Sequence, residues 1–358
     1  MELKVTIFDT IIIGGGQAGL ATAYHLRRAG VNFIILDDQP KPGGAWQRTW
    51  DSLRLFSPTE YSSIPGWQMP KGDQEYPHKN EFIDYLSKYE KRYGFQIERP
   101  VRVNSVRRNG AAYDIDTDKG VYHAKTVVSA TGTAQNPFIP DYAGRDLFHG
   151  PQLHSVDYRT NDPFKDQRVA IVGAGNSGAQ VLAEVSKVAD TTWVTLSEPH
   201  FMPDEVDGRY LFDKATQKFL QTAETGELDQ DGAEKVSLNN VVMVESVREA
   251  RTRDVLHSVR PFQEFYDRGV IWNDGSKTPF DAMIWCTGFR ANLDHLSELG
   301  MTVDGRIKTE GTRCVEDPNL WLVGYGGWTG YASATIFGVQ KTARTTAREI
   351  QKALETEA

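Results

Sequence analysis

The chain has 358 residues, 39% of them hydrophobic and 25% charged, which is the balance of a globular protein with room for two domains and excludes a disordered chain. Its 48 acidic and 40 basic residues leave a net charge of −8, which opposes rather than attracts nucleic acid. No apolar run is long enough to span a bilayer and no signal-peptide pattern opens the chain, so we expect a cytoplasmic protein that does not bind membranes.

The first predicted elements are a strand, a glycine-rich turn and a helix around residues 10–20, TIIIGGGQAGL. Gly14, Gly16 and Gly19 fit the pattern G-x-G-x-x-G. In that pattern the first glycine makes the turn, the second admits a pyrophosphate, and the third packs the helix against the strand. Phosphates would then lie on the free N–H groups of the helix start. Taken alone, the pattern also fits a glycine turn with a purely structural role.

A second apolar run, residues 31–36, follows the helix, which we expect to end at Gly30. Asp37 closes this run at the distance from the glycines where a carboxylate meets a ribose hydroxyl. An acid there favours a ribose without a 2′-phosphate, as in FAD or NAD. The alternative is that Asp37 or Asp38 merely ends a strand in solvent.

The loop after this acid, DQPKPGGAW, joins Gly43 and Gly44 to Trp46. Two interpretations are open: a backbone packed tightly on a cofactor, or an ordinary loop anchored by a core tryptophan. The next segment, 50–70, is rich in aromatic residues, Pro and Ser without a clear period. Such a composition is typical of an ordered loop over a site.

A helix is predicted from Asn80, as its N-cap, to a stop at Gly94. The aromatic residues at helical spacing within it are expected in the core. Three short alternating runs between 101 and 128 then predict an antiparallel meander. The meander leads into a strand that ends at Thr131 and Gly132.

A second copy of the opening pattern, RVAIVGAGNSGAQVLAEV, places Gly173, Gly175 and Gly178 between a strand and an amphipathic helix. We expect a domain crossing before it, within residues 136–163. Two such motifs predict two dinucleotide sites. The alternative for the second is a structural turn in a flavodoxin-like fold.

The residues after the next strand bear on the choice between NADH and NADPH, because an arginine there usually meets the 2′-phosphate. Here the chain has Ser197, Glu198 and His200, and the next arginine is Arg209. Glu198 would repel a phosphate, whereas Ser197 and His200 could donate hydrogen bonds to either nucleotide. We therefore predict NADH tolerance or relaxed use of both nucleotides.

The remainder of the chain contains a charged, mostly helical segment over about 200–268, further strands, and a last helix over about 332–354. The return of sheet-forming sequence implies that the tail rejoins the first domain. We predict an α/β fold of two Rossmann-like dinucleotide-binding domains. The first domain would comprise residues 1–150 and 286–358, and the second, inserted domain residues 151–285 with the helical segment.

With these residues placed, the chain resembles the bacterial flavin-containing monooxygenases, which are two-dinucleotide-binding-domain flavoproteins. Their fingerprint F-x-G-x-x-x-H-x-x-x-Y/F appears between the glycine loops as FHGPQLHSVDY, at Phe148, Gly150, His154 and Tyr158. Related Baeyer–Villiger enzymes usually carry Trp in place of Tyr158. From its type alone, His154 is expected to be a structural hydrogen-bonding histidine rather than a base. In the family, it would link the domains on the nicotinamide side.

Other matches support the resemblance. The family pattern E-x-x-x-x-x-G-G-x-W is present with Asp37 in place of Glu, and ATG at 130–132 is a further match. SLRLFSP followed by Pro-Gly-Trp at 65–67 resembles a short-form subfamily associated with arsenic and metal resistance.

The resemblance implies FAD in the first domain, NAD(P)H in the second, and no metal. The FAD contacts it implies are Gly14, Gly16, Gln17, Ala18, Gly19, Asp37, Gly44, Trp46, Val103, Thr131 and Gly132. The NAD(P)H contacts it implies are His154, Tyr158, Gly173, Gly175, Asn176, Ser177, Gly178, Ser197, Glu198 and His200.

The resemblance also implies a mechanism. NAD(P)H reduces FAD by hydride transfer, O2 adds to the reduced flavin as a C4a-hydroperoxide, and a soft nucleophile takes the distal oxygen. Because the cofactor carries the chemistry, no catalytic triad or carboxylate pair is needed, and the protein supplies a dry pocket. The implied substrates are O2 with small sulfides or amines, and ketones through Baeyer–Villiger oxidation. We expect a homodimer.

One position departs from the family pattern. Many members carry an Asn that faces flavin and substrate, and alignment of SLRLFSP puts Phe56 there. Since Phe cannot hydrogen-bond, we predict a shorter-lived oxygenating intermediate and more uncoupled peroxide. The alternative is that Phe56 is simply a wall of the pocket.

Other functions stay open at this point. The first is an NAD(P)H oxidase or reductase of the same fold, including one linked to metal or arsenic resistance. The second is a nucleotide-binding redox sensor without turnover. A thioredoxin-reductase role is disfavoured, because Cys286 and Cys314 are the only cysteines and do not form C-x-x-C.

Overall fold

The computed structural model describes residues 6–206, 209 and 240–356. The chain forms two compact units. Unit 1 comprises Met1–Gln47, Ser57–Asn136 and Arg290–Ala358, and unit 2 comprises Arg48–Phe56 and Pro137–Phe289. In the sequence, unit 2 is therefore inserted into unit 1, and it also takes a short segment from the loop after the first glycine motif.

Unit 1 is built on a mixed sheet. Its strands are β1 Ile7–Ile13, β2 Phe33–Leu36, β3 Ile97–Glu98, β4 Val103–Asn109, β5 Ala112–Thr117, β6 Gly120–Ser129, β17 Thr309–Glu310, β18 Arg313–Cys314 and β19 Leu320–Leu322. The order is β17-β18-β19-β6-β1-β2-β3, and β19, β6, β1, β2 and β3 run parallel. β4, β5 and β6 pair antiparallel, which confirms the predicted meander. A separate hairpin joins β15 Thr302–Val303 to β16 Arg306–Ile307.

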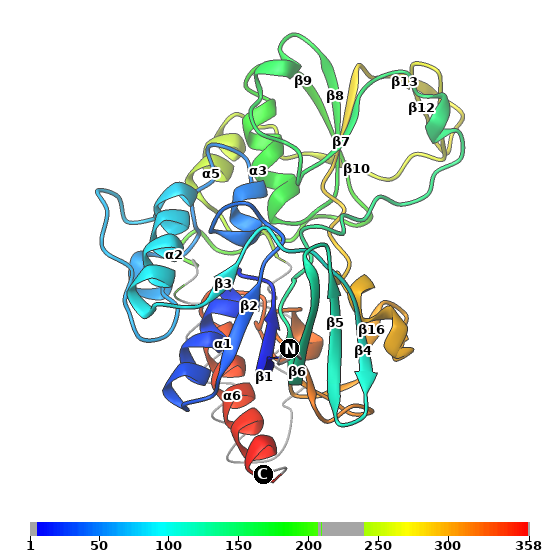
Figure 1. Cartoon of the computed structure of the whole chain (residues 1–358). Helices are drawn as coiled ribbons and strands as arrows, with labels where there is room; N and C mark the ends of the chain where they lie inside the picture. The colour runs from blue at the N-terminus through cyan, green and yellow to red at the C-terminus, as the bar shows by residue number, and fades with distance from the viewer. Residues whose placement is uncertain (1–5, 207–208, 210–239, 357–358) are drawn as a thin grey trace, which may run out of the picture. The chain divides into compact units, whose positions relative to one another are not determined.

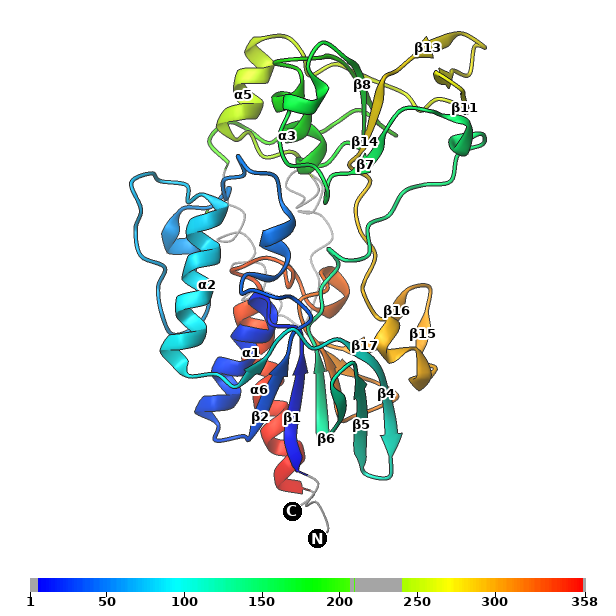
Figure 2. The same ribbon diagram turned by 45° about the horizontal axis from the view of Figure 1, so that its top comes forward.

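The helices of unit 1 are α1 Gln17–Arg28, α2 Lys79–Tyr93 and α6 Val339–Thr356. Figures 1 and 2 both show α6 beside α1, next to β1 and β2. The central strands are apolar throughout because they are covered: Ile11, Ile12, Ile34 and Ile35 are all fully buried. The sheet therefore holds the carboxyl ends of β1 and β2 in a rigid frame.

Two helix boundaries differ from the sequence prediction. α2 is capped by His78, not Asn80, because His78 Nδ1 accepts from the Asn80 N–H at 3.2 Å while the Glu81 carboxylate accepts from the His78 N–H at 2.6 Å. The predicted stop at Gly94 is confirmed, and so is the burial of Phe82, Tyr85 and Tyr89, whereas Tyr93 is only half-buried. α6 begins at Val339 rather than near 332, because Ser333 bonds back to the Gly326 carbonyl and holds the preceding residues in turns.

Unit 2 repeats the strand–loop–helix arrangement. Its strands are β7 Gln152–His154, β8 Arg168–Val172, β9 Asp190–Val194, β10 Ser258–Val259, β11 Glu264–Tyr266, β12 Gly269–Ile271, β13 Lys277–Pro279 and β14 Ala282–Trp285, and its helices are α3 Asn176–Val185 and α5 Glu245–Thr252. A parallel sheet has the order β10-β9-β8-β14-β7, and a small antiparallel sheet has the order β11-β12-β13. Figure 2 shows this second sheet at one end of the unit.

The segment predicted to be mostly helical over about 200–268 is only partly so where it is described. α5 is helical, but β10 and β11 are strands within it, so the prediction is wrong for those residues. Residues 207–208 and 210–239 of this segment lie outside the described part of the chain. Among the helices that the structure describes, none is long and apolar enough to cross a bilayer.

Candidate functional site

The first glycine loop connects β1 to α1 in unit 1. Gly14 has φ 107°, and a Cβ placed on it would lie 2.5 Å from the carbonyl oxygen of Ala130. A Cβ on Gly19 would lie 2.0 Å from the Gly14 carbonyl oxygen. Side chains at either position would push apart the strand, the loop and the helix. The first and third glycines are thus required by packing.

The second glycine of this loop has a different environment. Gly16 has an ordinary backbone conformation as the N-cap of α1, and no side chain caps the helix. A Cβ on Gly16 would meet only the Cα of Gly44, at 3.9 Å, among the described atoms. The loop therefore leaves open space in front of the uncapped N–H groups of α1, which fits a pyrophosphate.

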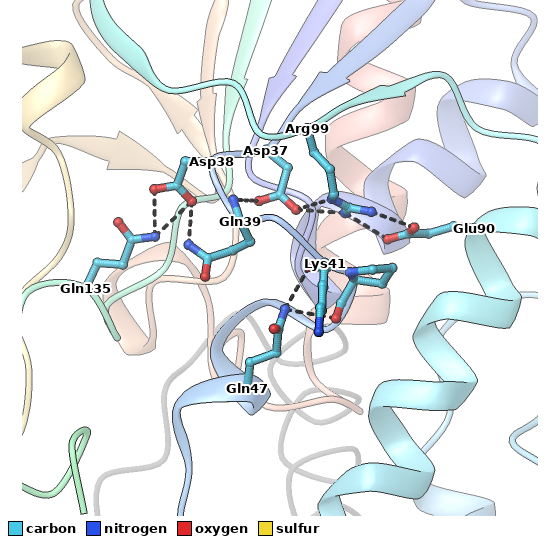
Figure 3. Close-up of polar contacts among 9 residues, drawn as sticks. Asp37, Asp38, Gln39, Lys41, Gln47, Glu90, Arg99 and Gln135 are labelled. Carbon is cyan, nitrogen blue, oxygen red and sulfur yellow. Dashed lines mark hydrogen bonds and ion pairs between the residues drawn. The ribbon is translucent and has the colours of Figure 1, made fainter. Parts of the chain in front are cut away.

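A buried ion-pair network lies beside this loop, at the end of β2 (Figure 3). Arg99 donates to Asp37 Oδ2 from Nε at 2.8 Å, and its other nitrogens donate to the two Glu90 oxygens at 2.8 and 2.9 Å. The side chains of Asp37, Arg99 and Glu90 are 4%, 12% and 10% exposed. Asp37 does not, therefore, end its strand in solvent.

The charge of Asp37 is set by two opposing effects. Burial raises the pKa of this carboxyl, and the Arg99 charge and hydrogen bonds act in the opposite direction. A Cβ on Gly15 would lie 2.6 Å from both the Asp37 and the Arg99 side chains. The middle glycine of GGG is thus needed for this pair to lie against the loop.

A second polar cluster surrounds Asp38. Gln135 donates to both carboxylate oxygens of Asp38 at 2.9 Å, and the Gln39 side chain donates to Oδ1 at 2.6 Å (Figure 3). Gln135 comes from the segment after β6, so two strand ends are tied together here. The network around Asp37 and the cluster around Asp38 form one polar edge of unit 1.

The loop with Gly43, Gly44 and Trp46 packs on the glycine loop itself. A Cβ on Gly44 would lie 2.8 Å from the Gly16 Cα. Trp46 donates its indole N–H to Gln17 Oε1 at 3.0 Å, and Gln17 donates to the Ala334 carbonyl at 2.9 Å. Gln17 therefore bridges two loops of unit 1, and its contact with a pyrophosphate stays a prediction.

The strand end at Thr131 is held by buried hydroxyls. Thr131 Oγ1 donates to the Asn292 carbonyl at 2.6 Å and lies 2.7 Å from the Tyr325 hydroxyl, which is itself 2.5 Å from Ser129 Oγ. Gly132 has φ 66°. Other predicted FAD contacts lie in packed positions of the same unit: Ala18 is buried in α1, and Val103 opens β4 against the core.

The second glycine loop, between β8 and α3, has the same construction. A Cβ on Gly173 would lie 2.2 Å from the Cys286 carbonyl oxygen, and one on Gly178 would lie 2.0 Å from the Gly173 carbonyl oxygen. Gly175 is an N-cap without a side-chain cap, and no described atom lies within 4 Å of a Cβ there. Asn176 binds the 240–242 backbone through both amide atoms, while Ser177 is half-buried in the first turn.

The residues after β9 lie at the surface. Ser197, Glu198 and His200 are exposed. Glu198 Oε2 forms an ion pair with Arg260 Nη2 at 2.9 Å. The His200 carbonyl accepts from the Val241 N–H at 2.8 Å, which fixes the backbone of this segment.

The fingerprint residues are packing residues of unit 2. Phe148 is buried in an aromatic cluster, and a Cβ on Gly150 would lie 2.5 Å from the Phe148 ring. His154 donates from Nε2 to the Gly288 carbonyl at 3.0 Å and accepts at Nδ1 from the Val156 N–H at 3.2 Å. Burial lowers the pKa of His154, so it is a neutral, structural hydrogen-bonding residue. Tyr158 is fully buried, and its contact with NAD(P)H stays a prediction.

Phe56 lies in unit 2, in the short segment taken from the loop after the first glycine motif. Its half-buried ring packs against the cluster of Met202, Val206 and Val242. The Ser52 hydroxyl of the same segment donates to Glu184 Oε2 at 3.0 Å, and the Asp51 N–H donates to the Arg159 carbonyl at 2.9 Å. Phe56 is thus part of an apolar wall, and its position relative to a flavin stays a prediction.

Neither cysteine has the environment of a redox thiol. Cys286 and Cys314 are both buried, and neither forms a disulfide. Burial raises the pKa of the Cys286 thiol to about 12, so the thiolate that disulfide chemistry requires is absent at neutral pH. Among the described residues, no group of His, Cys, Asp and Glu side chains gathers as a metal site.

Sequence reasoning missed Arg99, Glu90, Gln135 and Arg260. Arg99 follows β3, which pairs in parallel with β2, so it reaches the same sheet edge as Asp37. The sequence offered one signal for Arg99, the short strand that precedes Arg99 and Pro100. If that strand is a parallel neighbour of β2, it must end beside Asp37. The signal for Glu90 was weaker: it is an acidic residue at a buried position of a helix.

Comparisons with known proteins agree with this geometry. Residues 11–324 match the family described as pyridine nucleotide-disulphide oxidoreductase. The flavin-containing monooxygenase from Stenotrophomonas maltophilia is 44% identical, with a TM-score of 0.89, over 98% of this chain and 100% of that one. The chain belongs to the flavin-containing monooxygenases of this family.

More distant similarities also extend over nearly the whole chain. The uncharacterized oxidoreductase CzcO from Bacillus velezensis is 31% identical over 93% of this monooxygenase and 96% of its own length. A cyclohexanone monooxygenase shares the fold, with a TM-score of 0.75 at 16% identity, over 98% of this chain and 88% of that one. The predicted fold class of two dinucleotide-binding units is confirmed, and so are the enzyme class and a flavin and a pyridine nucleotide as cofactors.

Proposed function

We propose that this monooxygenase binds FAD on the first glycine loop and NAD(P)H on the second, and that it oxygenates small soft nucleophiles. Sulfides are the foremost class, with amines and, by Baeyer–Villiger oxidation, ketones as further substrates. The pair of glycine loops carries the proposal. Each has an open second glycine before an uncapped helix.

The network around Asp37 supports FAD on the first loop. Arg99 occupies Oδ2, whereas Oδ1 accepts a long hydrogen bond of 3.4 Å from the Gln39 N–H. A carboxylate oxygen has more than one acceptor direction, so Oδ1 keeps capacity for a ribose hydroxyl. Arg99 and Glu90 would hold this acceptor in place.

FAD held on the first glycine loop would supply the redox chemistry: two electrons from NAD(P)H would allow one oxygen atom of O2 to enter the substrate while the other leaves as water. The protein then has three tasks: to hold the cofactors, to orient the substrate, and to keep water away. The apolar wall around Phe56 suits the last task. No acid–base pair is required, which agrees with the absence of such a motif in the sequence.

We also propose relaxed use of NADH and NADPH, since Glu198 disfavours a 2′-phosphate while Arg260 is available to it. A homodimer is proposed as well, and sedimentation velocity tests it.

Product analysis tests the proposed function. The holoenzyme is given methyl phenyl sulfide or cyclohexanone under ¹⁸O2 with NADPH or NADH. We expect sulfoxide with one labelled oxygen atom, with either nucleotide. Nucleotide oxidation that yields only hydrogen peroxide would favour the oxidase alternative, and a purified protein that binds no flavin would overturn the proposal.

Phe56 can be tested in the same assay. Phe56→Asn restores a hydrogen-bonding side chain and should lower the hydrogen peroxide released per NADPH oxidised, by about twofold or more. Phe56→Leu is the matched control, because it keeps the site apolar and should leave the ratio high. Equal peroxide ratios for both variants and the wild type would show that Phe56 is only a wall.

A further inference from the structure

The edge of unit 2 at which a dinucleotide ribose would bind includes a residue distant in sequence. β10 pairs in parallel with β9, with Ser258 opposite Trp193, and the Thr195 N–H donates to the Val259 carbonyl at 2.9 Å. Arg260 follows β10 directly, as Thr195 follows β9. Because parallel strands end at one edge, Arg260 lies beside the segment that carries Ser197 and Glu198.

The Arg260 side chain is held toward that segment. Its Nη2 lies 2.9 Å from Glu198 Oε2 and donates to Ser258 Oγ at 2.6 Å. The side chains are 43% and 75% exposed. An ion pair this exposed is weak, because water competes for both partners. An anion with a higher negative charge could therefore replace the Glu198 carboxylate on Arg260 with little loss of free energy.

The geometry points to Arg260 as the residue that binds the 2′-phosphate of NADPH, with Glu198 as its built-in competitor. This rests on the proposed binding of NAD(P)H to unit 2. A guanidinium suits a phosphate because it offers parallel N–H donors and a fixed charge. With NADPH the phosphate replaces Glu198 on Arg260. With NADH the Glu198–Arg260 pair stays closed and leaves a neutral edge for the ribose hydroxyls.

This arrangement would allow one site to use both nucleotides, as proposed above. Glu198 alone would repel a 2′-phosphate, and Arg260 alone would favour NADPH strongly. When the two side chains pair, both the repulsion of the 2′-phosphate by Glu198 and the preference of Arg260 for NADPH become weaker. Sequence reasoning looked for an arginine directly after β9 and reached Arg209, whereas the neighbouring strand β10 supplies Arg260 at the same edge.

Binding of two adenosine probes to the FAD-loaded enzyme tests the inference by calorimetry. 2′,5′-ADP carries the 2′-phosphate, and 5′-AMP lacks it. Arg260→Gln should lower the affinity for 2′,5′-ADP about tenfold relative to that for 5′-AMP. Glu198→Gln should raise the same ratio about threefold or more, because the competitor is removed. In the Arg260→Gln background, Glu198→Gln should raise the ratio much less.

Arg168→Gln is the matched control. Arg168 pairs with Asp281 on the exposed surface, but it opens β8 and so lies at the opposite edge of the sheet. This variant should leave the ratio unchanged. A ratio that Arg260→Gln does not change, or a Glu198→Gln effect of equal size in both backgrounds, would overturn the inference while the proposed function stands. A wild-type enzyme that binds neither probe and whose flavin is reduced by neither nucleotide would overturn both.

Discussion

The two glycine loops share one backbone design and differ in what lies beside them. In both, a Cβ placed on the third glycine would lie 2.0 Å from the carbonyl oxygen of the first glycine, and the second glycine faces open space. Beside the first loop, Asp37 and its partner Arg99 are 4% and 12% exposed. Beside the second, Glu198 and Arg260 are 75% and 43% exposed.

This difference has a functional meaning. A buried acid that is held by an arginine, itself fixed by a second acid, has one geometry and suits a cofactor that stays bound through turnover. An exposed pair opens at little cost and suits a nucleotide that enters and leaves in each cycle. We propose that the same loop design serves retention of FAD in unit 1 and exchange of NAD(P)H in unit 2, and four variants test that contrast.

The largest effect on stability is expected at the third glycine of each loop, Gly19 and Gly178. Gly19→Ala and Gly178→Ala each place a methyl group into a backbone carbonyl and should lower the free energy of unfolding by about 4 kcal/mol or more. Thermal and urea unfolding measure this. Gly175→Ala is the control, since its Cβ meets no described atom within 4 Å, and it should unfold like the wild type. Equal stabilities for all three variants would contradict the packing argument.

Removal of Arg99 comes next. Arg99→Met removes the positive charge that pairs with the buried carboxylates of Asp37 and Glu90, which should destabilise the protein by about 3 kcal/mol and weaken FAD binding. Urea unfolding and FAD titration of the apoprotein measure the two effects. Arg107→Met, which breaks an exposed ion pair with Glu298 in the same unit, is the matched control and should change neither. A stable Arg99→Met variant with normal FAD affinity would show that the buried network is dispensable.

The pH dependence of this loss has a definite sign. Burial raises the pKa of Asp37 above its ordinary value of 3.8, and Arg99 opposes the rise. A carboxyl with a raised folded-state pKa favours folding below its unfolded pKa, and that contribution is lost as the pH rises through the folded pKa. Without Arg99 the folded pKa rises further. Arg99→Met should therefore be more destabilising at about pH 8 than at about pH 5, and urea titrations at both values check it.

The smallest effect is expected at the exposed pair. Glu198→Gln should change the free energy of unfolding by less than about 1 kcal/mol, while it shifts nucleotide preference. Urea unfolding beside the probe titrations separates the two. A stability loss as large as that of Arg99→Met would remove the distinction between the two loops.

Local pattern was enough to predict both strand–loop–helix units. G-x-G-x-x-G between a strand and a helix has few structural solutions, and alternation with turn residues predicted the β4–β5–β6 meander. The resemblance and the glycine spacing also led to the family. Asp37 was predicted to lie beside the first glycine loop because its place in the chain, directly after the second strand, is local information.

The sequence predictions failed where a residue's position depends on tertiary contacts. Arg99 and Arg260 reach their sites through parallel pairing of β3 with β2 and of β10 with β9, and parallel neighbours are distant in sequence. The cap of α2 went to His78 because an imidazole nitrogen can accept as a cap does, although histidine is an unusual choice. Segment 48–56 read as part of the first domain, yet its backbone bonds to residues of unit 2.

The assignment of one cofactor to each loop is tested most directly by Gly16→Ala and Gly175→Ala. Both variants keep an allowed backbone and should fold, while the added methyl group occupies the space in front of one helix. Bound FAD after desalting and NADP⁺ affinity by calorimetry are measured for each. We expect Gly16→Ala to lose FAD, and Gly175→Ala to keep FAD fully while its NADP⁺ affinity falls about tenfold or more. Loss of FAD from Gly175→Ala, with FAD retained by Gly16→Ala, would contradict it.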